Sequence, residues 1–154
     1  MERTVHHTDS VAATEAIGAA LAEKMRADPT LPPFVALYGD LGVGKTALIR
    51  GFVSVIAPGV AVRSPTFALV NEYRARPRSL FHFDMYRIDS EDDLDSIGFY
   101  DYLERNGICL VEWSEKIPYA LPDRRIRVDI QKCSPEDPDR RIITITPIEG
   151  ADLQ

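Results

Sequence analysis

The chain has 154 residues, of which 45% are hydrophobic and 27% charged, and its formal net charge is −6; this predicts one domain over residues 1–154 with a core of its own. The acidic balance argues against a nucleic-acid-binding module, which usually carries a basic stripe, so no DNA binding is expected. The N-terminal segment has no signal-peptide pattern and no apolar run approaches the roughly 18 residues of a membrane span, so we expect a cytoplasmic protein without membrane contact.

The first predicted element is a helix that follows the capping residues 8–10. Its buried face is marked by four residues at helical spacing: Thr14, Ile17, Leu21 and Met25. This helix is expected to end near Asp28, because Pro29 does not continue it. Phe34–Tyr38 is then a short, continuously apolar run, as in a buried strand of a parallel sheet. Lys45–Ile56 follows as a second, largely apolar helix that a Pro-Gly pair terminates.

Two strand-like runs, residues 67–73 and 79–86, are separated by a short segment that contains Pro77, which is typical of a hairpin. Ser90 and the three acids after it indicate the start of another helix. There the Ser90 hydroxyl and the Asp93 carboxylate can accept hydrogen bonds from free amides. The alternative is an acidic metal cluster, but acids in the first turn of a helix are routine, and the cap is favoured.

The second half of the chain predicts three more strands. Residues 108–111 form an apolar run, with Cys109 inside it as a buried thiol. Residues 124–132 and 140–148 alternate apolar and polar side chains, as half-exposed antiparallel strands do. Together the elements predict an α/β fold with a mixed sheet flanked by helices and with antiparallel C-terminal strands.

Histidines and clustered arginines predict no site of their own. His6 and His7 are assigned to a flexible terminus and His82 stands alone, so we expect no histidine-based metal site. The clustered arginines are interpreted as solvated loop charges rather than as an RNA footprint. They are Arg74, Arg76, Arg78, Arg124, Arg125, Arg140 and Arg141.

A phosphate-binding motif lies between the strand at Phe34–Tyr38 and the helix at Lys45–Ile56. Its pattern, G-x-x-x-x-G-K-S/T, is filled at every fixed position by Gly39, Asp40, Leu41, Gly42, Val43, Gly44, Lys45 and Thr46. Glycines let the backbone amides approach phosphate oxygens, and the helix N-terminus favours negative charge. Lys45 supplies an ammonium for the β- and γ-phosphates, and Thr46 a hydroxyl for Mg²⁺. The motif therefore predicts ATP with Mg²⁺ as the ligand and a P-loop NTPase-like fold.

A site of this kind needs a further carboxylate, normally at the end of another strand. Asp84 and Glu112 each follow a buried run, so with Thr46 they could divide the work of binding Mg²⁺ and orienting the attacking water. The alternative is that each is a charge at a strand end. Residues 64–66 lie where such proteins often sense the γ-phosphate, and Thr66 could contact Mg²⁺ or water; the alternative is a rigid turn.

Four blocks of the sequence resemble the TsaE (YjeE) family and occur in its order. They are GDLGVGKT at residues 39–46, SPTF at 64–67, HFDMYR at 82–87 and EWSEK at 112–116. The first block is shared by many families, whereas the last two are far more particular. The resemblance covers roughly residues 14–116 and implies the small ATPase of the bacterial machinery that makes the threonylcarbamoyladenosine modification of tRNA.

The resemblance also implies roles for single residues. Lys45 and Thr46 would contact the phosphates and Mg²⁺, and both Lys45 and the two acids would be catalytic. Asp84 would be the Walker-B-like acid, Glu112 a metal-associated acid, and Trp113 a neighbour of the nucleotide. Which of the two acids ligates the metal directly stays open.

The resemblance assigns a role to two further positions and shows a departure from the family at two others. Thr66 would belong to a switch-like segment, and Thr14, in the first helix, would lie near the adenine. Val43 and Ala47 depart from the family, which more often has alanine at the first position and a second hydroxyl at the second. Without that hydroxyl, Ala47 offers no side-chain contact to the α-phosphate, which puts nucleotide affinity in question but not the reaction.

The expected function is a slow ATPase whose hydrolysis drives a conformational cycle in a partner. By resemblance the partner is the TsaB–TsaD complex, and tRNA is contacted only indirectly. Arg50, Arg63 and Arg87 are open candidates for the γ-phosphate. One alternative is a small-molecule kinase, although residues 90–106 are too acidic for a phosphate lid. A GTPase is not favoured, because the sequence lacks the guanine-reading N-K-x-D motif. A non-hydrolysing, nucleotide-dependent scaffold remains the other alternative.

Overall fold

The computed structural model describes residues 1–40, 42–65 and 67–150. Its strands are β1 (Thr4–Thr8), β2 (Phe34–Tyr38), β3 (Val70–Tyr73), β4 (Ser79–Asp84), β5 (Gly107–Glu112), β6 (Arg125–Ser134) and β7 (Asp137–Ile148). They form a seven-stranded sheet in the order β1-β7-β6-β2-β5-β4-β3. β2 pairs in parallel with β5 and β6, and β4 with β5. β3, β7 and β1 run antiparallel to their partners, which confirms the predicted mixed sheet and antiparallel C-terminal strands.

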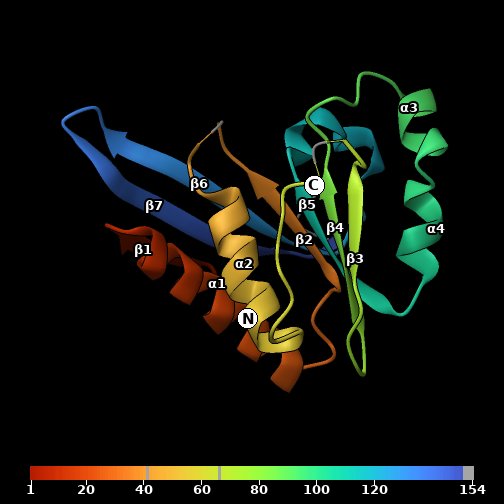
Figure 1. Cartoon of the computed structure of the whole chain (residues 1–154), viewed down its shortest axis with the longest axis horizontal. Helices are drawn as coiled ribbons and strands as arrows, with labels where there is room; N and C mark the ends of the chain where they lie inside the picture. The colour runs from red at the N-terminus through yellow and green to blue at the C-terminus, as the bar shows by residue number, and fades with distance from the viewer. Residues whose placement is uncertain (41, 66, 151–154) are drawn as a thin grey trace.

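Helices cover both faces of the sheet. They are α1 (Val11–Ala27), α2 (Lys45–Ile56), α3 (Glu91–Ser96) and α4 (Phe99–Glu104), with two 3₁₀ turns, η1 (Ser114–Lys116) and η2 (Pro118–Ala120). Figure 1 shows α1 and α2 on one side of the sheet and α3 and α4 on the other. Within the described ranges, no helix is long and apolar enough to cross a membrane.

Side chains along β2 alternate between two hydrophobic cores, one on each face of the sheet. Val35 and Leu37 are fully buried in the core that includes α1 and α2. Phe34 and Ala36 point the other way, into the core that includes α3 and α4. A strand that is apolar at every position is buried on both faces, as its sequence predicts. β2 is therefore held rigidly where the phosphate-binding motif begins.

Two glycines bring α1 against α2. A Cβ atom at Gly18 would lie 1.9 Å from the carbonyl oxygen of Leu48, and one at Gly51 would lie 1.8 Å from that of Glu15. Any larger residue would push the helices apart, because these neighbours are backbone atoms. The close approach fixes the N-terminal part of α1 beside the start of α2.

The predicted hairpin is confirmed, but its first strand is shorter than expected. β3 begins at Val70 rather than at residue 67. Leu69 has a φ of 65°, and its amide donates to the Pro65 carbonyl at 2.9 Å, so a turn precedes the strand. At the start of α3, the Ser90 hydroxyl accepts from the Asp93 amide, as its sequence predicts.

The assignment of His6 and His7 to a flexible terminus is wrong, because both lie in β1, which pairs with β7. Alternation along β1 turns polar side chains inward and leaves Val5 47% exposed. The strand is held by its backbone ladder and offers no apolar pattern from which to predict it. Cys109 is buried as predicted, and burial raises the pKa of its thiol to about 12.

Candidate functional site

The predicted loop and both predicted acids meet at one edge of the sheet. Asp84 and Glu112 are register partners at the carboxyl ends of the parallel strands β4 and β5, and the loop follows the neighbouring β2. Ligands of open α/β sheets bind at this edge. A pocket of about 270 Å³ lies there, lined by Gly42, Gly44, Lys45, Thr46, Ala47, Ser64, Asp84, Glu112 and Trp113. Leu41 and Thr66, both predicted for the site, lie outside the described residues.

The loop presents backbone amides at the N-terminus of α2. Gly44 is the N-cap residue, with a φ of 112° that favours glycine, and no side chain caps the helix. A Cβ atom at Gly42 would meet nothing within 4 Å, so the loop also has free space beside it. Uncapped amides and the helix dipole together favour an anion at this position.

Lys45 is folded into the loop. Its ammonium donates to the Gly39 carbonyl and, at 3.4 Å, to the Asp40 carbonyl, and it lies 3.8 Å from the centre of the Trp113 ring. Burial lowers the pKa of Lys45, while nearby carboxylates, chiefly that of Glu115, oppose the shift. Trp113 has a φ of 59°, unusual for an aromatic residue and a form of backbone strain that clusters at functional sites.

Thr46 and Glu112 bring two hard oxygen groups together. The Thr46 hydroxyl lies 3.2 Å from Oε1 of Glu112 and 3.4 Å from Oε2, although 66 residues separate the two in the chain. Glu112 is only 4% exposed. A hydroxyl beside a carboxylate, next to the uncapped amides of α2, suits Mg²⁺, which proteins usually bind through one or two side-chain oxygens plus phosphates.

His82 belongs to this group, so the prediction that it stands alone is wrong. Its Nε2 lies 2.6 Å from Oε2 of Glu112, and its Nδ1 lies 2.9 Å from the Tyr73 hydroxyl. A period of two along β4 puts His82 on the same face as Asp84, and that was the signal available in the sequence. No group of three or more His, Cys, Asp and Glu side chains that could hold a metal occurs in the described ranges.

Asp84 occupies a more open position than Glu112. It accepts hydrogen bonds from the Ser64 hydroxyl at 3.3 Å and from the Tyr86 amide at 3.0 Å. Ser64 belongs to the segment predicted to be switch-like, so Asp84 ties that segment to the pocket. The two acids therefore have different partners: Glu112 contacts the helix that carries the loop, and Asp84 contacts the segment before residue 66.

A smaller pocket, of about 110 Å³, lies on the α1 side of the loop. It is lined by Ser10, Val11, Thr14, Gly42, Val43, Gly44, Ala47, Asp139 and Arg141. Thr14 is 3% exposed, and its hydroxyl lies 3.1 Å from that of Thr8. The structure thus places Thr14 and Ala47 at the loop, and contact with the adenine or the α-phosphate stays a prediction.

Arg141 holds the loop from β7, so its interpretation as a solvated charge is wrong. Its Nε donates to the Val43 carbonyl at 2.8 Å, and its Nη2 lies 3.5 Å from the Gly42 carbonyl. No local pattern could reveal this contact, because 98 residues separate Arg141 from Val43. The β6–β7 hairpin creates it.

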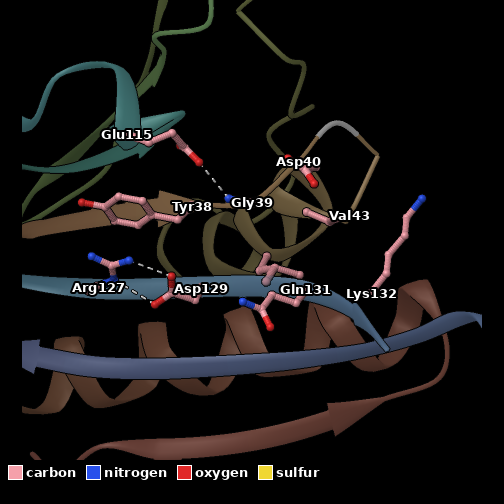
Figure 2. Close-up of a pocket in the computed structure, with 10 residues that line it drawn as sticks. Tyr38, Gly39, Asp40, Val43, Glu115, Arg127, Asp129, Gln131 and Lys132 are labelled. Carbon is pink, nitrogen blue, oxygen red and sulfur yellow. Dashed lines mark hydrogen bonds and ion pairs between the residues drawn. The ribbon is translucent and has the colours of Figure 1, made fainter. Parts of the chain in front are cut away.

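A third pocket, of about 550 Å³, borders the loop on the β6 side. Figure 2 shows Asp40 and Val43 above it and the side chains of β6 below. Glu115 accepts a hydrogen bond from the Gly39 amide at 3.2 Å. Arg127 forms two hydrogen bonds with Asp129, at 2.9 and 3.0 Å. Glu115 therefore holds the first residue of the loop, whereas Arg127 and Asp129 pair with each other on β6.

The arginines considered for the γ-phosphate lie elsewhere in the described part of the chain. Arg50 pairs with Glu15 at 3.1 Å, and Arg87 lies over the exposed Phe67 ring at 5.1 Å. Arg63 is exposed. The pocket of about 270 Å³ that Asp84 and Glu112 line, which we call the acid pocket, has no arginine among its described lining residues.

Comparisons with known proteins agree on one family. The family described as threonylcarbamoyl adenosine biosynthesis protein TsaE matches residues 8–142. A Haemophilus influenzae protein named tRNA threonylcarbamoyladenosine biosynthesis protein TsaE is 45% identical over 96 residues, which cover 62% of this chain and 61% of that protein. The match thus spans less than two thirds of that relative. A Bacillus subtilis protein of the same name is 37% identical over 114 residues, covering 74% and 69%.

A solved structure shows the same arrangement over almost the whole chain. The crystal structure of Bacillus subtilis YdiB superposes with a TM-score of 0.77 at 28% sequence identity. The superposition covers 99% of this chain and 90% of that one. The similarity therefore includes β1 and the β6–β7 hairpin as well as the central strands.

Proposed function

The chain belongs to the TsaE family of threonylcarbamoyl adenosine biosynthesis proteins, and from this we propose that it is a slow, Mg²⁺-dependent ATPase. One observation carries the proposal: the Thr46 hydroxyl lies 3.2 Å from the buried Glu112 carboxylate, beside the uncapped amides of α2. A site of this composition suits a triphosphate with its metal, because phosphoryl transfer depends mainly on positioning and charge neutralisation.

The residues divide the work between binding and activation. The loop amides and the Lys45 ammonium would bind the phosphates, and Thr46 with Glu112 would supply oxygen ligands to Mg²⁺. Bound Mg²⁺ would neutralise charge on the β- and γ-phosphates. Asp84, which already accepts from Ser64 and is less buried than Glu112, would orient the attacking water. The low exposure of Glu112 keeps its carboxylate in one place, so little reorganisation accompanies the reaction.

We further propose that the ATPase works on a TsaB–TsaD complex in the cytoplasm. The acid pocket has no arginine among its described lining residues, which supports slow hydrolysis until a partner supplies the missing charge. A segment that differs between ATP- and ADP-bound states would then bind the partner differently in each. The net charge of −6 supports indirect rather than direct contact with tRNA.

The test is phosphate release from ATP by the protein alone, with TsaB–TsaD, and with tRNA added, while repeated cycles of tRNA modification are followed. We expect release to accelerate in the complex and modification to need this protein. If tRNA modification cycles equally well with the Lys45→Ala variant, or without this protein, the proposed role in tRNA modification is refuted. Stoichiometric phosphorylation of a small metabolite would favour a kinase instead, and nucleotide-dependent complex formation without phosphate release would favour a scaffold.

A further inference from the structure

His82 is a fully buried polar side chain that the proposed chemistry has not yet used. Its exposure is 0%, and its two ring nitrogens contact Glu112 on one side and Tyr73 on the other. A buried imidazole with both nitrogens bonded is stable in place, whereas the loss of one partner is costly. The ring therefore forms a fixed bridge between β3 and the acid at the end of β5.

The hydrogen-bond donors and acceptors around His82 show which ring nitrogen must carry a proton. An ionised carboxylate only accepts, so the short contact with Glu112 requires a proton on Nε2 of His82. In the neutral ring Nδ1 then accepts, and the Tyr73 hydroxyl is the donor. That hydroxyl also lies 3.3 Å from the Arg63 carbonyl, which accepts from the Asn71 amide at 3.0 Å as well. The assignment that matters for Glu112 is the proton on Nε2, which the carboxylate requires in either charge state of the ring, while Tyr73 contacts Nδ1 at 2.9 Å.

We propose that His82 is a positioning residue for Glu112, held in place by Tyr73. It binds Oε2 at 2.6 Å and thereby leaves Oε1, 3.2 Å from the Thr46 hydroxyl, to face the metal position. Without this bond a glutamate side chain can rotate about its last torsion, and neither oxygen is presented in a defined direction. The inference rests on the proposed Mg²⁺-ATP function and deepens it by assigning a residue outside the ligand set.

Two substitutions of the same residue separate the two ring nitrogens. In His82→Gln the amide nitrogen reaches near the position of Nε2, so a donor to Glu112 remains. In His82→Asn the amide lies near Nδ1, so the contact with Tyr73 can remain while Glu112 loses its donor. Both variants remove the ring from the same buried place and therefore serve as matched controls for loss of packing.

The measurement is the dissociation constant for ATP, by calorimetry on the full chain, with Mg²⁺ and with a chelator in its place. We expect His82→Asn to weaken Mg²⁺-dependent binding about 10–100-fold, as the loss of an orienting partner of a metal ligand does. Binding without Mg²⁺ should change little, because the loop amides are untouched. His82→Gln should recover most of the loss. In the presence of TsaB–TsaD, kcat should fall more than KM rises for His82→Asn.

Equal Mg²⁺ dependence in the wild type and His82→Asn would overturn the inference, and so would equal losses in the two variants. If neither variant folds, Tyr73→Phe decides, because it keeps the ring and removes only the hydroxyl. A weaker Mg²⁺ response in folded Tyr73→Phe supports the positioning role of His82 and Tyr73, and an unchanged response overturns it. Failure of the proposed function looks different: the wild type would show Mg²⁺-dependent ATP binding but no phosphate release with its partners.

Discussion

The loop of residues 39–46 and the acid side of the pocket face each other but are built differently. The loop is contiguous in the chain and offers mainly backbone amides at the start of α2, where Gly42 and Asp40 are exposed. The acid side is assembled from β4 and β5, and its key group, Glu112, is 4% exposed and bonded to other side chains. Amides persist through most substitutions, whereas a side-chain network depends on every member.

This difference predicts that substitutions in the two regions impair different steps. Changes in the loop should affect the binding of the triphosphate, and changes on the acid side should affect turnover and the response to Mg²⁺. Lys45 and Thr46 are the exceptions in the loop, because their contributions come from side chains. The two regions meet at these residues, because Thr46 contacts Glu112 and Lys45 lies over the Trp113 ring.

The largest effect is expected from Lys45→Ala, which removes the cation from the loop and leaves the amides in place. Hydrolysis should be lost and triphosphate binding weakened, with the fold intact by circular dichroism. Phosphate release and ATP affinity are the measurements. A folded variant with wild-type hydrolysis would show that this loop is not a phosphate-binding site.

The second effect concerns the acids. Glu112→Gln and Asp84→Asn should lower turnover by on the order of 10²-fold or more, because each removes a charge-stabilising group. ATP binding should survive better than turnover. Glu112→Gln should also lose Mg²⁺ dependence, because its carboxylate contacts Thr46, while Asp84→Asn should retain more of it. Normal turnover in both variants would reduce these residues to charges at strand ends.

A smaller effect is expected where the loop depends on a distant side chain. Arg141→Ala removes the donor to the Val43 carbonyl and should weaken ATP binding about fivefold, the equivalent of roughly 1 kcal/mol. Arg140→Ala is the matched control, because Arg140 is exposed and faces Asp137 at 3.6 Å. If the two variants bind ATP equally well, the hydrogen bond from Arg141 to the Val43 carbonyl does not shape the loop.

The smallest signal is spectroscopic. Trp113 is the chain's one tryptophan and lies at 3.8 Å from the Lys45 ammonium, so ATP with Mg²⁺ should change its fluorescence as Lys45 moves to the phosphates. Lys45→Ala should weaken the response. A flat signal at saturating ATP would separate Trp113 from the nucleotide and leave the ATPase proposal standing.

Local sequence patterns specify the parts of the protein that depend on neighbours in the chain. The strand at Phe34–Tyr38, the loop and α2 follow from local pattern, because a continuous apolar run, a glycine-rich turn and a helix start are each specified within a few residues. The acids Asp84 and Glu112 could be named for the same reason, since each directly follows an apolar run and is the last residue of its strand.

The side chains that support these groups are selected by contacts between distant parts of the chain. The register of β4 against β5 sets Asp84 beside Glu112, and the pairing of β3 with β4 brings Tyr73 to His82. The β6–β7 hairpin brings Arg141 to a loop 98 residues away. Such contacts join residues through strand pairing and buried hydrogen bonds, and neither leaves a periodic pattern in the local sequence. β1 escaped prediction for the same reason, because its backbone ladder to β7 stabilises it without an apolar face.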